Sequence, residues 1–295
     1  MTMNFTSGAA LLELCKEYNC TISEVMIRRE MALSEISRED ILARMAHSYS
    51  IMKEAVAEGK SGNLRSVGGL IGGEAKKLLD WANSNPTCGS LISRAAAYAM
   101  GVLEVNASMG LIVAAPTAGS AGVIPGVFLA MQEEYGYSDE QMTDALFTAG
   151  AVGYIIMRNA TVAGAEGGCQ AEIGAAAAMA SAAAVQLLGG TPQQCLYAAT
   201  DVLANMLGLV CDPIAGLVEA PCQKRNATGA SNALICTQMA LSGIPAIIPF
   251  DEMVEAMYRV GRSIPYELRE TALGGVAGTP TACELCDQIF CEKHK

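Results

Sequence analysis

Three cysteines lie in glycine- and proline-rich segments of an apolar central region. Cys169 follows two glycines and has a glutamate on each side, whereas Cys211 and Cys222 bound a segment with two internal prolines. Glycine and proline beside a cysteine leave backbone N–H groups exposed, and these stabilise a thiolate or a cluster sulfur by hydrogen bonding. A polar turn at residues 115–122 interrupts another apolar stretch. These three segments are where we expect the chemistry.

The spacing of the three cysteines restricts which metal they would hold. A structural zinc site usually uses paired Cys-x-x-Cys motifs, and none of the three belongs to one. Only two histidines are present, which disfavours hydrolytic zinc and non-haem iron. With gaps of 42 and 11 residues, cluster ligands would have to converge from separate loops. Because a buried free cysteine is the commoner case, spacing alone leaves both possibilities open.

Several polar side chains near these segments are candidates for catalysis or binding. Glu166 and Glu172 flank the first cysteine and could serve as a base, or equally as helix caps or surface groups. Lys224 is the one lysine between residues 77 and 293, so a Schiff base in the core has a single candidate, although a structural or orienting role is favoured. Arg225 could orient a carboxylate, because its guanidinium group can donate two parallel hydrogen bonds to it. Asn226, the next residue, could also orient a carboxylate. Thr117 and Ser120 are candidate substrate or cluster hydrogen-bonders, or equally plain turn residues.

The composition excludes some partners. The chain has 295 residues, of which 52% are hydrophobic, and 19 basic residues against 30 acidic ones. An acidic balance argues against nucleic acid, since phosphate binding needs clustered lysine and arginine. The opening residues lack the basic region of a signal peptide, and the cysteine number, 11, is odd. We therefore expect a reducing, cytoplasmic compartment without disulfides.

Three long stretches carry no charge at all: residues 105–132, 173–200 and 226–250. Each is long enough to span a bilayer. They consist largely of alanine, glycine, serine and threonine and are interrupted by prolines. Membrane spans are much richer in leucine and isoleucine. The three stretches instead predict buried helices that pack closely because their side chains are small, with no membrane contact.

Helix signals recur along the chain. Residues 24–57 are charged and periodic, and the sequence Ser-Arg-Glu-Asp from Ser37 resembles a capping box within them. Ser138 and Thr191 each begin a capping box, the second with proline at the first helical position. Apolar residues within 253–260 fall on one helical face. Alternating strand patterns are absent, so we predict an all-α fold.

Longer strings around these residues carry a resemblance. They are Gly-Cys-Gln-Ala-Glu-Ile-Gly around Cys169, Cys-Asp-Pro-Ile-Ala-Gly-Leu-Val-Glu-Ala-Pro-Cys from Cys211 with Gln-Lys-Arg-Asn after it, Ala-Pro-Thr-Ala-Gly-Ser-Ala-Gly from Ala115, and Leu-Arg-Glu-Thr-Ala-Leu-Gly-Gly from Leu268. Together these strings resemble the iron-sulfur-dependent bacterial L-serine dehydratases, and more closely the α chain of the two-chain form. The resemblance covers about residues 61–275.

The resemblance implies a fold, a cofactor and a reaction. It implies that the catalytic part is all-helical. From the helix signals we expect a single compact helical catalytic domain over residues 61–295, preceded by a helical arm over residues 1–60 that packs on the core or on a partner chain. The resemblance also implies that Cys169, Cys211 and Cys222 hold a 4Fe-4S cluster with one open iron. That iron would act as a Lewis acid while L-serine is converted to pyruvate and ammonia without pyridoxal phosphate. Elimination from L-cysteine, or a non-catalytic iron-sulfur regulatory subunit, are the alternatives.

The chain departs from the family in two places. In single-chain relatives a cysteine near the C-terminus caps the open iron in the resting enzyme. Cys283 falls at nearly that distance, although it and Cys286 could equally be incidental thiols of a helical tail. A Ser-His-Thr-Val-Gly-Pro-like segment, which supplies an active-site histidine in the family, is missing, and neither His47 nor His294 replaces it by motif. This implies a separate β chain that completes the site, and little activity for the α chain alone.

Overall fold

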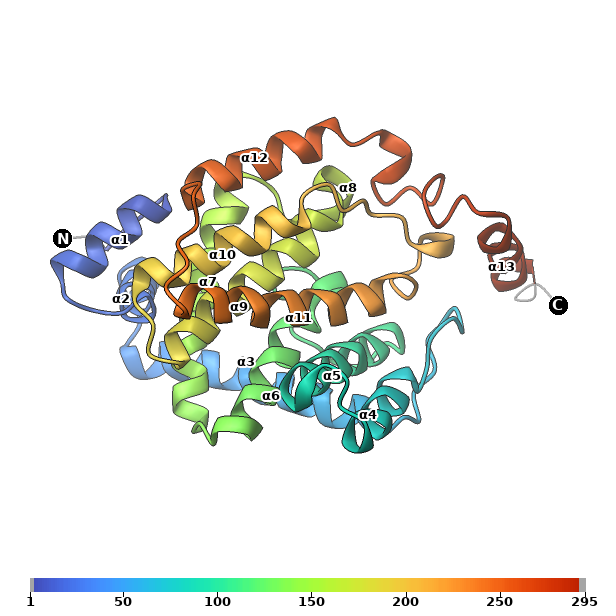
Figure 1. Ribbon diagram of the computed structural model, residues 1–295, viewed down its shortest axis with the longest axis horizontal. Coiled ribbons are helices and arrows are strands. Elements are labelled where there is room, and N and C mark those ends of the chain that lie inside the picture. Colours follow the sequence, from blue (N-terminus) through green and yellow to red (C-terminus); the bar gives the residue numbers. More distant parts are fainter. Residues whose placement is uncertain (1–2, 292–295) are drawn as a thin grey trace.

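The computed structural model describes residues 3–291, which form thirteen α-helices and no β-sheet (Figure 1). The predicted all-α fold is confirmed. The helices are α1 (Gly8–Glu17), α2 (Ile22–Ser34), α3 (Arg38–Gly59), α4 (Glu74–Ser84), α5 (Gly89–Ala107), α6 (Val123–Tyr135), α7 (Asp139–Asn159), α8 (Gly164–Gly167), α9 (Ala175–Leu187), α10 (Pro192–Met206), α11 (Cys222–Leu241), α12 (Phe250–Ser263) and α13 (Pro280–Cys291).

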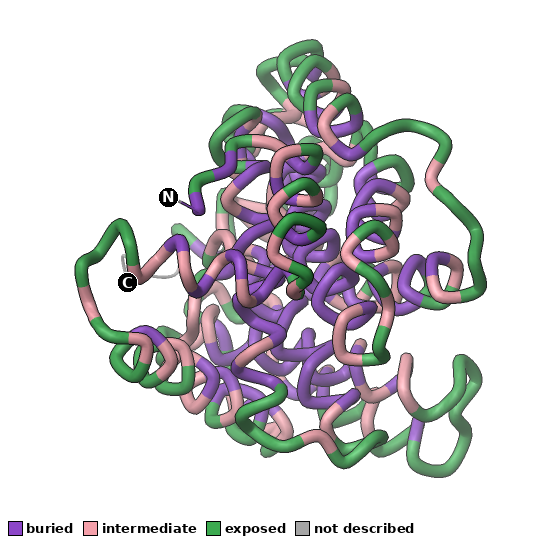
Figure 2. Tube along the Cα trace, turned by 90° about the vertical axis from the view of Figure 1, so that its left-hand side faces the viewer, coloured by how far each residue is buried: buried purple, intermediate pink, exposed green. Residues whose placement is uncertain are grey.

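The alanine-rich helix α9 forms the centre of the core. Every residue from 175 to 185 is buried, and α6, α7, α10 and α11 pack around the helix. Figure 2 shows this buried interior enclosed by the more exposed outer turns. Small side chains let the surrounding helices approach, as expected for the charge-free stretches. None of the helices in the described part of the chain combines the length and apolarity needed to cross a bilayer.

Helices α5 and α6 show how close this approach is. Gly122 directly precedes α6, and a Cβ atom there would lie 2.1 Å from the carbonyl oxygen of Ala99 on α5. Any larger side chain would push the two helices apart. The turn that precedes α6 is therefore pressed against the core, which fixes the position of the polar segment before it.

The predicted helix starts are confirmed. Ser138 and Thr191 form complete capping boxes at the starts of α7 and α10. Ser37 accepts a hydrogen bond from the Asp40 amide and begins α3. The periodic segment 24–57 is thus divided between two helices, because Glu35 adopts a left-handed conformation that ends α2.

The helices of the first sixty residues share the main core. Phe5, Leu11 and Tyr49 belong to the same hydrophobic cluster as α9. Asp251 of α12 accepts hydrogen bonds from the Gly8 and Ala9 amides, which fixes the start of α1. A boundary between arm and catalytic domain at residue 60 stays a prediction.

Three loops meet near the start of α11. The amide of Gln170 donates to the carbonyl of Leu209, and the amide of Cys211 donates to the carbonyl of Leu268. Figure 1 shows the loop before α11 reaching toward α13 at the right-hand end of the molecule. The loops that carry the three candidate cysteines therefore lie together, although they are far apart in the sequence.

Candidate functional site

Two of the three predicted cysteines lie against one carboxylate. The Sγ atoms of Cys169 and Cys211 and a carboxylate oxygen of Glu172 all lie within 4.8 Å of one another. Cys222, at the start of α11, is also buried. Its thiol is not among the atoms that meet within this distance. Burial, followed by the charges of Cys169 and Glu172, raises the pKa of the Cys222 thiol to about 12.

A π-helical turn positions Cys169 and Glu172. Residues Gln170–Gly174 form this wider turn directly before α9. The buried amide group of Gln170 anchors it by donating to the Met257 carbonyl at 2.9 Å and accepting from the Gly208 amide at 2.9 Å. Single π turns inside helices are frequent at functional sites, where they change the direction of a side chain.

Cys211 is held through its backbone. Its amide donates to the Leu268 carbonyl at 2.9 Å, and its carbonyl accepts from the Glu270 amide at 2.6 Å. These two bonds form an isolated parallel bridge with Arg269. The C-terminal segment therefore lies along the Cys211 edge of the site.

The glycine-rich segment near residue 68 holds a carboxylate that the sequence analysis missed. Glu219 is buried and accepts hydrogen bonds from the Ser66 hydroxyl at 2.6 Å, the Gly68 amide at 2.6 Å and the Leu70 amide at 3.0 Å. Because Glu219 lies in the loop that leads to Cys222, this cradle fixes the approach to the third thiol.

Glu172 is the acid–base group nearest the thiols. Its Oε1 accepts a hydrogen bond from the Thr117 hydroxyl at 2.8 Å, and Oε2 lies 3.8 Å from the Cys211 thiol. Burial raises the pKa of Glu172, and the hydrogen bond from Thr117 partly opposes this effect. Ser120, also predicted, is buried 3.1 Å from the Thr117 hydroxyl.

Arg225 is the cation of the site. Its Nη1 lies 3.6 Å from the Cys169 thiol, 2.7 Å from Asp212 Oδ1 and 2.8 Å from the Val210 carbonyl. A hydrogen bond from the Cys211 thiol and the charge of Arg225 hold the pKa of Cys169 below its ordinary value, although burial acts in the opposite direction. Asp212, which pairs with this cation, was missed by the sequence analysis.

Of three other candidate residues, one is buried and two are exposed. Asn226 is buried and uses both amide hydrogens on the Gly119 and Cys222 carbonyls, so it ties the 115–122 turn to α11. Lys224 is exposed on α11. Glu166 is exposed and accepts from the Thr161 hydroxyl, so its carboxylate is directed to that partner.

Cys283, Cys286 and His47 do not belong to the thiol group described above. Cys283 is exposed on α13, a helix that packs against residues Ile214–Gly216 of the loop before Cys222. His47 is exposed on α3, and His294 lies outside the described residues. Capping by Cys283 stays a prediction.

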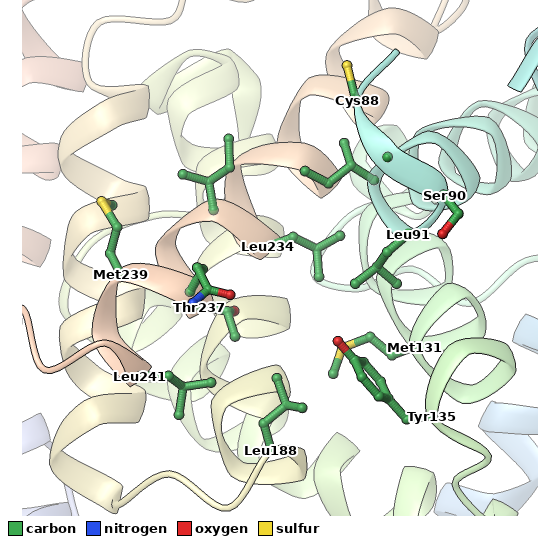
Figure 3. A pocket seen from close by; sticks show the side chains of 14 residues that line it. Cys88, Ser90, Leu91, Met131, Tyr135, Leu188, Leu234, Thr237, Met239 and Leu241 are labelled. Atoms are coloured by element: carbon green, nitrogen blue, oxygen red, sulfur yellow. The ribbon is translucent and has the colours of Figure 1, made fainter. Parts of the chain in front are cut away.

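A separate pocket of about 400 Å³ lies between α5, α6 and α11 (Figure 3). Among the described residues, no charged side chain lines this pocket. The pocket also shares no lining residue with the thiol site. It offers an apolar surface but no acid or base. Its lining residues include Cys88, Leu91, Met131, Tyr135, Leu188 and Leu234.

Comparison with known proteins identifies the family. The sequence profile described as "Serine dehydratase alpha chain" matches residues 17–277. A "Probable L-serine dehydratase, alpha chain" of Bacillus subtilis is 51% identical over 97% of this chain and 95% of that protein. The "L-serine dehydratase, alpha chain" of Peptoniphilus asaccharolyticus is 43% identical over 93% of this chain and 94% of that protein. An "L-serine dehydratase" of Helicobacter pylori is 36% identical over 94% of this chain, which matches 62% of that longer protein. The chain therefore belongs to the serine dehydratase alpha chain family.

Proposed function

We propose that the chain is the α subunit of a cytoplasmic iron-sulfur L-serine dehydratase, which eliminates water from L-serine to give pyruvate and ammonia without pyridoxal phosphate. The family supports the activity. The observation that carries the proposal is the meeting of Cys169, Cys211 and Glu172. The third expected thiol, Cys222, is buried at the start of α11.

The donor set fits an iron-sulfur cluster. Cys169, Cys211 and Cys222 would hold a 4Fe-4S cluster, because thiolates are the usual ligands of such clusters. Arg225 adds a positive charge beside the first thiol, which favours its ionised form. Bound there through three thiolates, the cluster supplies a Lewis-acidic iron that makes the serine hydroxyl a better leaving group.

The residues of this chain would carry the proton chemistry. Glu172 is the proposed base: burial raises its pKa, which makes its carboxylate a better acceptor for the α-proton of serine. As the Cα–H electrons form the double bond, the Cβ–O bond breaks and hydroxide leaves, to be protonated to water. The aminoacrylate then tautomerises to an imine, which water hydrolyses to pyruvate and ammonia. Arg225 would orient the serine carboxylate, whereas the Thr117 hydroxyl, with Ser120 beside it, would hold the Glu172 carboxylate in position.

A separate β chain would complete the site. Relatives matched over nearly their whole length are named alpha chains, whereas the H. pylori protein is longer than the matched region. Within the described part of this chain, the one histidine is His47, which is exposed on α3. We propose that the β chain supplies the histidine-bearing segment, so that the α chain alone has little activity.

The test is anaerobic reconstitution of the chain with its β partner, iron and sulfide, followed by a pyruvate assay. Pyruvate from L-serine supports the proposal. Pyruvate only from L-cysteine would favour a desulfidase, which a thiophilic iron could also serve. A complete cluster that yields pyruvate from neither amino acid would make the chain a non-catalytic regulatory subunit.

A further inference from the structure

The segment after α12 is tied to the thiol site by a second contact besides the Cys211 bridge. We call residues 268–276 the C-terminal strap. The amide of Val276 in this strap donates to Asp212 Oδ2 at 2.6 Å. The other oxygen of Asp212 lies 2.7 Å from Arg225 Nη1, which itself lies 3.6 Å from the Cys169 thiol. One buried carboxylate therefore joins the strap to the cation of the site.

The glycine before Val276 allows this contact. Gly275 has φ +60°, and a Cβ atom there would lie 2.2 Å from Asp212 Oδ2. An alanine would thus be strained in its backbone and would also push the Asp212 carboxylate away. At the other end of the strap, Arg269 Nη1 reaches the Glu166 carbonyl at 3.5 Å, in the segment that leads to Cys169.

We propose that Asp212 is a positioning residue that latches the C-terminal strap over the thiol site, and that it does so through its ion pair with Arg225. The carboxylate needs both partners, because a buried charge is costly unless it is paired and hydrogen-bonded. While Arg225 holds Asp212 in place, Val276 and the bridge to Cys211 keep the strap closed along the site. Loss of the pair frees the carboxylate, and the strap opens and exposes the Cys211 edge to solvent and oxygen. This inference deepens the proposed function, since it concerns access to the same site.

Amide hydrogen exchange of the strap in the complex with the β chain tests the latch directly. Asp212→Asn should raise the exchange rate of peptides covering residues 268–276 about tenfold, because the bond from the Val276 amide loses its charge assistance and the ion pair with Arg225 is removed. Arg225→Gln should raise it about threefold, although no contact joins Arg225 to the Val276 amide. Arg225→Lys, which keeps a cation, should recover part of the protection.

Coupling between the two residues distinguishes a latch from general loosening. If Asp212 acts through Arg225, the double variant exchanges about as fast as Asp212→Asn alone. Effects that multiply, or faster exchange spread over all helices, would overturn the latch. Gly275→Ala should mimic Asp212→Asn. Gly136→Ala is the matched control, because Gly136 has a similar φ of +71° but open space around its Cβ position.

A second readout connects the latch to the proposed cluster. In the reconstituted complex, the visible absorption should be lost in air at least about threefold faster in Asp212→Asn than in wild type or Gly136→Ala, since the open strap admits oxygen. Equal rates would overturn the role of the strap in protecting the site. If the wild-type complex makes no pyruvate but the exchange coupling is present, the proposed function fails and the latch stands. If pyruvate is made and the coupling is absent, the latch alone fails.

Discussion

The thiol of Cys211 lies 3.8 Å from Oε2 of Glu172, although 39 positions separate the two residues in the chain. In the proposed function, a carboxylate group so close to an iron ligand would be placed to receive a proton from the substrate. Its hydrogen bond from Thr117 fixes the orientation of the carboxylate. The two glutamates that flank Cys169 therefore differ in role, because only Glu172 contacts the site.

Replacing Glu172 should separate catalysis from cluster binding. Glu172→Gln keeps the size and the hydrogen bond from Thr117 but cannot accept the α-proton, so we expect kcat to fall about 10²- to 10⁴-fold with iron content unchanged. Steady-state kinetics and iron analysis of the α–β complex check this. Glu166→Gln is the comparison and should stay within about twofold of wild type, because Glu166 is exposed and bonded to Thr161. A normal rate in Glu172→Gln would remove Glu172 as the base.

Single cysteine substitutions should identify the cluster ligands. Cys169→Ser, Cys211→Ser and Cys222→Ser should each lose most of the visible cluster absorption and iron, because a hydroxyl is a poor substitute for a thiolate. Cys195→Ser and Cys236→Ser remove equally buried thiols elsewhere and should keep the full absorption. Retention of a complete cluster in all three ligand variants would show that the ligand assignment is wrong. Loss of the cluster absorption in a control variant would instead identify that control cysteine as a ligand.

The glycine-rich cradle should contribute to stability. Glu219→Ala leaves three donors without a partner, namely the Ser66 hydroxyl and the Gly68 and Leu70 amides. We expect the free energy of unfolding to fall by about 3 kcal/mol, measured by urea denaturation. Glu255→Ala, which breaks an exposed ion pair with Arg259, should cost less than about 0.5 kcal/mol. Equal losses would mean that the cradle does not anchor the loop before Cys222.

Local features of this protein could be predicted from sequence, and distant pairings could not. The helix starts at Ser138 and Thr191 depend on a group three residues away, so the residue types alone reveal them. The charge-free stretch 173–200 likewise reveals buried helix α9, but the prediction is wrong for residues 108–117 and 242–249 of the other two stretches, which are loops. Glu219 and Gly68, in contrast, are 151 positions apart, and no local pattern marks glycine amides as partners of a particular carboxylate.

In the candidate site, too, the sequence marked individual residues but not their distant partners. Cysteine spacing alone favoured buried free thiols over a metal site. A resemblance of longer strings, not geometry, singled out Cys169, Cys211 and Cys222. Asp212 was missed because its partner amide, Val276, lies 64 positions away. An isolated carboxylate next to Cys211 in a charge-poor region was the available signal, since a charge there needs a buried partner.

The pH dependence of the free energy of unfolding should reveal the raised pKa of Asp144, a carboxylic acid outside the thiol site. Burial raises its pKa, partly opposed by hydrogen bonds to its Oδ2 from the Ser23 hydroxyl at 2.8 Å and Gln186 Nε2 at 3.0 Å. A group whose folded-state pKa lies above its unfolded value binds more protons when folded, so its contribution to stability is lost as the pH rises above the unfolded value of 3.8 and through the folded one. Asp144→Asn cannot ionise, and its amide oxygen can still accept both bonds.

The variant should therefore gain stability relative to wild type as the pH rises from about 4 to 7, and the two should converge at the acid end. Urea denaturation of both proteins across this range gives the difference directly, and the other titrating groups cancel in it. Ser23→Ala is the informative second variant, because it removes a bond that favours the ionised form and should steepen the loss of stability with rising pH. A difference between Asp144→Asn and wild type that stays constant with pH would show that Asp144 titrates alike in the folded and unfolded chain.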